Sequence, residues 1–288
     1  MIHARNPSLG GSWSVKKIAI LPTVMTLGNG VCGFSAIVAA SKIDGGSLTE
    51  HYFWVSACLV LAAMLFDVLD GFLARLSRTA SEFGGQLDSL CDVVSFGVAP
   101  AYLILRLGRE WDTLLMRNTV SVVAALYLVC VILRLARFNI ENAPDPASHR
   151  RFKGLPSPAG AGCIISLAVL RSQTPDNWAG LDPDILKGVV KVWATVGALV
   201  VALLMVSRVA YPHLTRGVLR GRRPFSYLLR IVLVVFVLAL AQELSVLLIF
   251  WGYALVFAMR HLLGQLRSPS RSLSPPMPPA PLDAPPPS

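Results

Sequence analysis

Four aspartates lie close together in the sequence and could bind metal ions. The chain has only 16 acidic residues, yet four aspartates fall within 26 residues: Asp67, Asp70, Asp88 and Asp92. Asp67 and Asp70 are three residues apart, and Asp88 and Asp92 are four apart, so each of these two pairs lies on one face of a helix. Two antiparallel helices with a short connection would bring these faces together. Oxygen ligands without Cys or His favour Mg²⁺ or Mn²⁺, and two such ions suit phosphoryl-type transfer.

The helices that carry these aspartates are predicted to cross a membrane. The chain is 54% hydrophobic and 15% charged, with a mean hydropathy of +0.61, which is too apolar for an ordinary soluble domain. A bilayer core needs roughly 20 apolar residues per helical span. The apolar runs are continuous rather than alternating, so they indicate an all-α, polytopic membrane helical bundle and not a barrel. Eight runs are predicted: Ile18–Ala40, Tyr52–Phe72, Asp88–Leu107, Thr119–Leu135, Pro156–Leu170, Val189–Val206, Leu228–Ala241 and Leu244–Leu262.

Carboxylates inside membrane helices are costly and therefore informative. Each costs roughly 2 to 3 kcal/mol on insertion scales, so four together need a compensating charge such as a divalent metal ion. The plain alternative is a solvated loop with Arg75 and Arg78 as ion-pair partners, but it does not explain why Asp67 and Asp70 interrupt an apolar run. Gly71 lets a ligand approach the backbone closely. Arg75, one turn further on, can reach a phosphate. Pro100 in the third run predicts a kink beside the cluster.

The distribution of basic residues predicts the orientation in the membrane. With eight spans, 19 Lys and Arg residues fall on the side of the N-terminus and 7 on the other side. Because basic residues stay in the cytoplasm, we expect both termini and the loops 73–87, 136–155 and 207–227 to face the cytoplasm, as does the acidic cluster. The formal net charge of +10 flanks apolar helices, which indicates lipid headgroups rather than nucleic acid as the partner. A plasma (inner) membrane location is expected.

Two features carry no predicted chemistry. The five cysteines lie in or beside apolar runs, their number is odd and no CxxC spacing occurs, so they are interpreted as small packing residues. After Gly264 the chain is rich in Ser and Pro, which cannot form a regular helix. We expect residues 265–288 to form a disordered or polyproline tail.

The acidic segment as a whole resembles the motif of the CDP-alcohol phosphatidyltransferases. It reads Asp67-x2-Asp70-Gly71-x2-Ala74-Arg75-x8-Gly84-x3-Asp88-x3-Asp92. The resemblance implies that Asp67, Asp70 and Asp88 bind one metal ion and that Asp67, Asp88 and Asp92 bind a second. It further implies that Asp92 takes the proton from the incoming alcohol. The CDP-lipid site would include these residues: Gly71, Arg75, Ser81, Thr26 and Asn29.

Further blocks resemble the branch of this family that uses serine as the acceptor. They are Leu27–Asn29 with Cys32–Phe34, Ser95–Pro100, Arg134–Asn139, Phe152–Pro158, and Met205–Ser207 with Tyr211 and Pro212. The resemblance implies CDP-diacylglycerol and L-serine as substrates, a six-helix catalytic core and a homodimer. The predicted division is therefore an N-terminal segment 1–17, a core 18–215, a basic loop with two further helices 216–264, and the tail 265–288.

The acceptor alcohol is the least constrained part of the prediction. Serine carries a carboxylate that calls for a fixed cation, and Arg134 and Arg137 lie three residues apart at one helix end. The alternative is that both are anchors for lipid phosphates. An acceptor with a second phosphate, glycerol 3-phosphate or inositol phosphate, stays open because Arg150, Arg151 and Lys153 follow nearby. A cation transporter and a structural membrane scaffold are the alternatives from other classes.

Overall fold

The structure is a computed structural model that describes residues 20–76, 81–109, 111, 113–141, 154–172, 183–207, 209, 211 and 243–267. Every regular element in these residues is a helix, which confirms the all-α prediction. The helices are α1 Ile20–Ser41, α2 Thr49–Leu76, α3 Glu82–Asp92, η1 Val93–Val98, α4 Ala99–Leu107, α5 Leu114–Glu141, α6 Ser157–Ser172, α7 Pro183–Val206 and α10 Glu243–Arg267.

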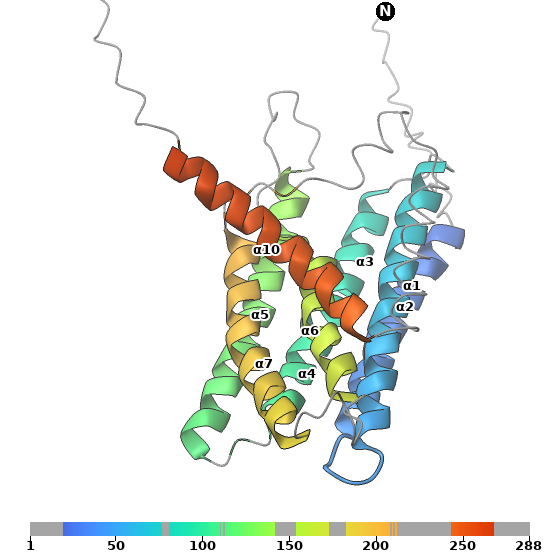
Figure 1. Cartoon of the computed structure of the whole chain (residues 1–288). Coiled ribbons are helices and arrows are strands. Elements are labelled where there is room, and N and C mark those ends of the chain that lie inside the picture. The colour runs from blue at the N-terminus through green and yellow to red at the C-terminus, as the bar shows by residue number, and fades with distance from the viewer. Residues whose placement is uncertain are drawn as a thin grey trace, which may run out of the picture.

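The helices form a bundle in which successive spans run up and down, and α10 crosses it obliquely (Figure 1). Five helices are long and apolar enough to cross a membrane: Ile20–Ser41, Thr49–Leu76, Glu82–Leu107, Leu114–Ile140 and Lys187–Val206. Two shorter apolar helices, Ser157–Ser172 and Val246–Arg260, match the fifth and eighth predicted runs. The seventh predicted run, Leu228–Ala241, lies outside the described residues. The chain is thus a polytopic membrane protein.

The short helix α6 lies at the centre of the bundle. All its residues from Gly160 to Arg171 are buried, as is Ser157 at its start. Leu155, just before it, is held by a hydrogen bond from its N–H to the carbonyl of Leu204 in α7, at 3.0 Å. A helix that is apolar on all sides is expected to be enclosed by others, and here it forms part of the surface on which α2, α7 and α10 pack.

The third span changes its helical type directly after Asp92. Residues Val93–Val98 form a π-helix between α3 and α4. Where the sequence predicts a kink at Pro100, the structure has these wider turns just before it. Pro100 has no N–H to donate to the Phe96 carbonyl four residues earlier, and the Tyr127 hydroxyl of α5 donates to that carbonyl at 3.0 Å instead. A side chain of the neighbouring helix α5 therefore supplies a hydrogen bond to the π-helix, beside the acidic cluster.

The end of the bundle opposite the acidic cluster holds basic residues in structural contacts. Arg106 donates to the carbonyl of Ser41 at 3.1 Å, and Arg109 donates to that of Ile43 at 3.2 Å. Arg171 is 8% exposed and forms an ion pair with Glu50 at 3.2 Å. These basic residues hold helix ends together, which accounts for part of the positive charge on the side expected to be outside.

Candidate active site

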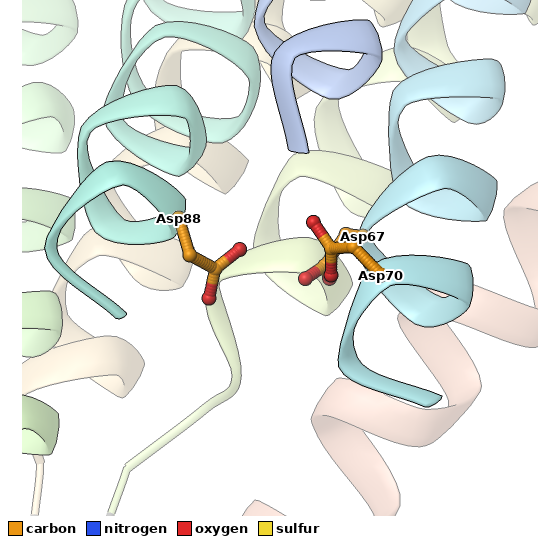
Figure 2. Close-up of side chains that lie close together, drawn as sticks. All are labelled: Asp67, Asp70 and Asp88. Atoms are coloured by element: carbon orange, nitrogen blue, oxygen red, sulfur yellow. The ribbon is translucent and has the colours of Figure 1, made fainter. Parts of the chain in front are cut away.

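Three carboxylates meet where α2 ends and α3 begins. Asp67 and Asp70 project from the last turns of α2, and Asp88 projects from α3 toward them (Figure 2). One carboxylate oxygen from each residue lies within 4.8 Å of the others. The i, i+3 spacing of Asp67 and Asp70 places both on one helix face, and α3, which packs on α1 and runs antiparallel to α2, brings Asp88 opposite. The predicted meeting of the two faces is therefore present for these three residues.

The carboxylate cluster fits a hard divalent cation. Asp70 is only 4% exposed, and its Oδ2 atom is buried without a hydrogen-bond partner among the described residues, as is Oδ1 of Asp88. Three negative charges this close repel one another and lose hydration, which is unfavourable unless a cation compensates. Carboxylate oxygens are the ligands that Mg²⁺ and Mn²⁺ prefer. The orphaned oxygens are thus what a site for such an ion requires.

Asp92 lies one turn further along α3 and has a different environment. It is 8% exposed and accepts a buried hydrogen bond at 2.9 Å from the side-chain amide of Asn29 to its Oδ1 atom. It is outside the group of three carboxylates that lie within 4.8 Å of one another, although it interacts electrostatically with Asp67 and Asp88. The four predicted aspartates therefore divide into a cluster of three and a neighbouring carboxylate with a fixed orientation.

A second contact fixes Asn29 itself. Asn29 is fully buried, and its backbone carbonyl accepts a hydrogen bond at 2.9 Å from the Ser95 hydroxyl in the π-helix. Gly33, one turn later in α1, lies directly against this residue, because a Cβ atom there would be 2.6 Å from Ser95 Cα. The close approach of α1 and η1 at a glycine thus sets the position from which Asn29 reaches Asp92. Sequence reasoning noticed Asn29 and Ser95 but not this contact.

Two of the residues implied for the CDP-lipid site lie beside the carboxylates. Thr26 of α1 is 5% exposed; its hydroxyl donates to the Pro22 carbonyl at 3.1 Å, and its side chain lies close enough to Asp70 to influence that carboxylate. Arg75 is exposed at the end of α2 and interacts electrostatically with Asp67 and Asp70. The positively charged guanidinium of Arg75 therefore lies at the rim of the acidic cluster.

Gly71 and Ser81 occupy positions with clear local roles. A Cβ atom at Gly71 would lie 3.8 Å from both terminal nitrogens of Arg75, so the glycine leaves the guanidinium close to the backbone. Ser81 is the N-cap of α3, and its hydroxyl oxygen accepts a hydrogen bond at 3.0 Å from the N–H of Gly84. An N-cap of this kind stabilises a helix start by about 1 kcal/mol. Ser81 therefore fixes the start of the helix that carries Asp88.

The two arginines considered for serine recognition lie in different surroundings. Arg134 is half-buried in α5 and donates a hydrogen bond at 2.8 Å to the hydroxyl of Ser157, the first residue of α6. It also interacts electrostatically with Asp92 and Asp67. Arg137 is exposed. Arg134 thus lies next to the carboxylates, and Ser157 belongs to the Phe152–Pro158 block that the sequence singled out.

A further contact ties α5 to α3 near the cluster. The Ser89 hydroxyl, adjacent to Asp88, accepts a hydrogen bond at 2.9 Å from the side-chain amide of Asn139. Asn139 ends the Arg134–Asn139 block, which the sequence singled out without a role for its last residue. The contact could have been suspected only from the polarity of an Asn at the end of an apolar run.

The fold and the site define a class of protein. A polytopic bundle of helices carries at one end a carboxylate cluster that fits a divalent cation, with arginines beside it. The family model of the CDP-alcohol phosphatidyltransferases matches residues 19–204, which is more than half of the chain. The chain belongs to the CDP-alcohol phosphatidyltransferase family.

Curated relatives extend this similarity. A CDP-diacylglycerol–serine O-phosphatidyltransferase of Mycobacterium bovis is 38% identical over 165 residues, 56% of this chain and 53% of the relative. The chain thus spans about half the length of that relative. The protein of the same name from Methanocaldococcus jannaschii is 32% identical over 69% of this chain and 77% of its own length. One from Helicobacter pylori is 32% identical over 85% of this chain and 92% of its own.

Proposed function

We propose that this protein transfers the phosphatidyl group of CDP-diacylglycerol to the hydroxyl of L-serine, yielding phosphatidylserine and CMP. The observation that carries the proposal is the three-carboxylate cluster of Asp67, Asp70 and Asp88 within a family domain. It is supported by similarity across most of the chain to a relative named for this reaction. The chemistry follows from the family, and the choice of serine follows from the names of the relatives.

The metal ligands in this proposal are the aspartates at the helix ends. Asp67, Asp70 and Asp88 would hold one Mg²⁺ or Mn²⁺ ion, and Asp92 would join Asp67 and Asp88 in holding a second. When bound, the ions neutralise the charge of the pyrophosphate and stabilise CMP as a leaving group. The orphaned oxygens of Asp70 and Asp88 support the first of these sites.

Asp92 is the proposed base. Its carboxylate accepts the proton of the serine hydroxyl, whose oxygen forms a bond to the lipid-linked phosphorus while the bond from that phosphorus to the oxygen of CMP breaks. Asn29 holds Oδ1 of Asp92 at 2.9 Å, so the carboxylate enters the reaction in one orientation and Oδ2 is the atom that takes the proton. A base held in place avoids the cost of orienting it during the reaction.

Arg134 is the proposed partner of the serine carboxylate. Its hydrogen bond to Ser157 at 2.8 Å fixes the guanidinium, and a guanidinium can bind a carboxylate through two parallel N–H groups. The attraction of Arg134 to Asp92 supports a site in which the acceptor's carboxylate and the base are neighbours. Arg137, exposed on the same helix, fits the role of an anchor at the membrane surface better.

The nucleotide end of the lipid substrate would lie on the other side of the cluster. Arg75 at the end of α2, with Gly71 leaving its guanidinium near the backbone, would contact the diphosphate. Ser81 at the start of α3 and Thr26 of α1 would line the cytidine side. Asn29 was assigned to the same site from the sequence, and its amide contact with Asp92 supports a role nearer to the base.

Location and assembly follow from the charge pattern and the family. The active site and both termini would face the cytoplasm in the inner membrane, because most basic residues lie on that side. A homodimer, and the division of the chain into segments 1–17, 18–215, 216–264 and 265–288, stay predictions. The basic residues Arg106 and Arg109 on the other side donate to the carbonyls of Ser41 and Ile43, which gives them a structural role there.

The test is an assay of CMP release by the purified protein in detergent. CDP-diacylglycerol and Mn²⁺ or Mg²⁺ are supplied with L-serine, glycerol 3-phosphate or inositol phosphate, and Asp92→Asn serves as the inactive control. Release with serine alone that is lost in the control supports the proposal. Release with another acceptor keeps the reaction type but overturns serine as the substrate. No metal-dependent release with any acceptor overturns the transferase.

A matched pair of variants tests the carboxylate partner. Arg134→Lys keeps the positive charge but loses the planar guanidinium and is expected to raise KM for serine by about tenfold or more, since hydrogen bonds to charged groups contribute about 1.5–3 kcal/mol. Arg137→Lys is the control and is expected to change KM for serine by less than about twofold. Equal effects of the two substitutions would contradict the assignment.

A further inference from the structure

The two residues that lead into α6 are docked on the end of α7 through their backbone. The N–H of Gly154 donates to the carbonyl of Val209 at 2.8 Å, and the N–H of Leu155 donates to that of Leu204 at 3.0 Å. The Leu155 side chain is fully buried. Two successive backbone hydrogen bonds beside a buried side chain therefore fix the place where α6 begins relative to α7.

This docking requires a glycine at position 154. The φ angle of Gly154 is +99°, which residues with a side chain rarely adopt. A Cβ atom there would also overlap the backbone carbonyl oxygen of Met205, which has no rotamer to move to. Gly160, in the first turn of α6, differs, because a Cβ atom there would overlap the terminal methyl group of the flexible Met205 side chain. A side chain at position 154 must therefore displace the docked residues themselves.

A short, rigid link connects the docked residues to Arg134. Pro156, whose ring fixes its φ angle, is the only residue between Leu155 and Ser157. Ser157 is fully buried and accepts a hydrogen bond at 2.8 Å from Arg134 of α5. Because α5 packs mainly on α7 and has little contact with α6, the end of α7 determines how Ser157 meets the guanidinium.

A single hydroxyl organises both carbonyls that hold the docked residues. Ser207 donates to the Leu204 carbonyl at 2.8 Å, which is the carbonyl that accepts from Leu155. The Ser207 oxygen also accepts from the N–H of Val209 at 3.3 Å, and the carbonyl of Val209 accepts from Gly154. Ser207 thus contacts both residues that hold the segment before α6.

We propose that Gly154 is a positioning residue for the acceptor substrate: by docking the start of α6 on the end of α7 it sets Ser157, and Ser157 sets the Arg134 guanidinium for the serine carboxylate. The inference rests on the proposed function and deepens it, since the affinity for the acceptor then depends on the end of α7. A guanidinium binds a carboxylate through two N–H groups only in a matching orientation. A shift of Ser157 therefore weakens serine binding and leaves the CDP-lipid side, at α2 and α3, unchanged.

The test compares Gly154→Ala with Gly160→Ala in the CMP-release assay. Gly154→Ala is expected to raise KM for L-serine about tenfold, because a hydrogen bond to a charged group is misaligned, while KM for CDP-diacylglycerol stays within about twofold. Gly160→Ala also adds one methyl group against Met205, but that flexible side chain can turn aside, so KM for L-serine should stay within about twofold. Thermal unfolding of both variants in detergent separates loss of stability from loss of acceptor affinity.

A double-mutant cycle shows whether Gly154 acts through Ser157. In a Ser157→Ala background, which lacks the hydroxyl that accepts from Arg134, the added effect of Gly154→Ala on KM for serine should fall to about twofold or less. Ser207→Ala is a milder variant that decides the question if Gly154→Ala does not fold. It loosens both carbonyls that hold the docked residues and should raise KM for serine about threefold, with KM for CDP-diacylglycerol unchanged.

Three results overturn the inference while the proposed function stands. They are an unchanged KM for serine in Gly154→Ala, or in Ser207→Ala if only that variant folds; an equal rise of KM for both substrates; and full additivity of Gly154→Ala with Ser157→Ala. A wild-type protein that releases no CMP with serine overturns the proposed function and the inference together.

Discussion

The side-chain amide of Asn29 in α1 donates a hydrogen bond at 2.9 Å to Oδ1 of Asp92 in α3, although 63 residues separate the two in sequence. Both residues are buried, so the contact is shielded from water and is stronger than the same contact at the surface. A carboxylate proposed as a base is thus oriented by a neutral amide from another helix. This relationship leads to the first prediction.

Asn29→Leu removes the donor to Asp92 while keeping a similar volume. Hydrogen bonds to charged groups contribute about 1.5–3 kcal/mol, so kcat should fall roughly 10- to 100-fold. KM for serine should change little, because Arg134 is untouched. The measurement is steady-state CMP release with serine varied at saturating CDP-diacylglycerol.

Ser95→Ala is the control for this prediction. It removes the hydrogen bond to the Asn29 carbonyl and leaves the amide that reaches Asp92. We expect a lower unfolding temperature and a decrease in kcat of less than about threefold. If the two variants lose kcat equally, Asn29 acts only through the packing of α1 against the π-helix.

Removal of a cluster carboxylate should abolish metal binding. Asp88→Asn deletes one of three oxygen ligands whose atoms lie within 4.8 Å of one another, and Mn²⁺ affinity should fall at least about tenfold. Titration of Mn²⁺ followed by electron paramagnetic resonance measures this without any assay of activity. Asp44→Asn, in the exposed loop at the other end of the bundle, should bind Mn²⁺ as the wild type does. Equal affinity in both variants would contradict the proposed site.

Close packing of α1 against the π-helix should make Gly33 intolerant of a side chain. A Cβ atom there would lie 2.6 Å from Ser95 Cα, and relieving such an overlap costs about 1–3 kcal/mol. Gly33→Ala should therefore lower the thermal unfolding temperature in detergent by several degrees. A Cβ atom at Gly188 would have no neighbour within 4 Å among the described residues, so Gly188→Ala should unfold at or above the wild-type temperature.

Loss of the Tyr127 hydroxyl should destabilise the irregular helix after Asp92. Tyr127 is fully buried and donates to the Phe96 carbonyl at 3.0 Å. Pro100, four residues after Phe96, has no N–H to donate to that carbonyl. Tyr127→Phe removes this donor to the buried carbonyl, at a cost of about 1–3 kcal/mol. Thermal unfolding measures the loss. An unfolding temperature equal to that of the wild type would show that the π-helix does not need this support.

The orientation of the bundle can be tested with single cysteines in a background lacking the five native ones. Ser47 lies exposed between α1 and α2, and Glu82 lies exposed at the start of α3 near the acidic cluster. In right-side-out vesicles a membrane-impermeant maleimide should label Ser47→Cys at once and Glu82→Cys only after permeabilisation. The reverse pattern would place the active site outside.

Much of the fold could be predicted from the lengths and composition of the apolar runs. Lipid provides no hydrogen-bond partners for the backbone, so a continuous apolar run must be helical, and the predicted Tyr52–Phe72 lies within the observed α2, Thr49–Leu76. Helix type was less predictable. The π-helix at Val93–Val98 accepts a hydrogen bond from a tyrosine of α5, which Pro100 alone does not reveal.

Within the candidate site, the sequence by itself determined which carboxylates share a helix face, because residues three or four apart on a helix point the same way. It thereby predicted that the pair Asp67 and Asp70 meets the pair Asp88 and Asp92, and the structure groups Asp67, Asp70 and Asp88. The contact of Asn29 with Asp92 and that of Ser157 with Arg134 became visible only in the folded bundle. Such partners depend on how each helix is rotated and shifted against its neighbours, and side-chain packing across the whole bundle sets that arrangement.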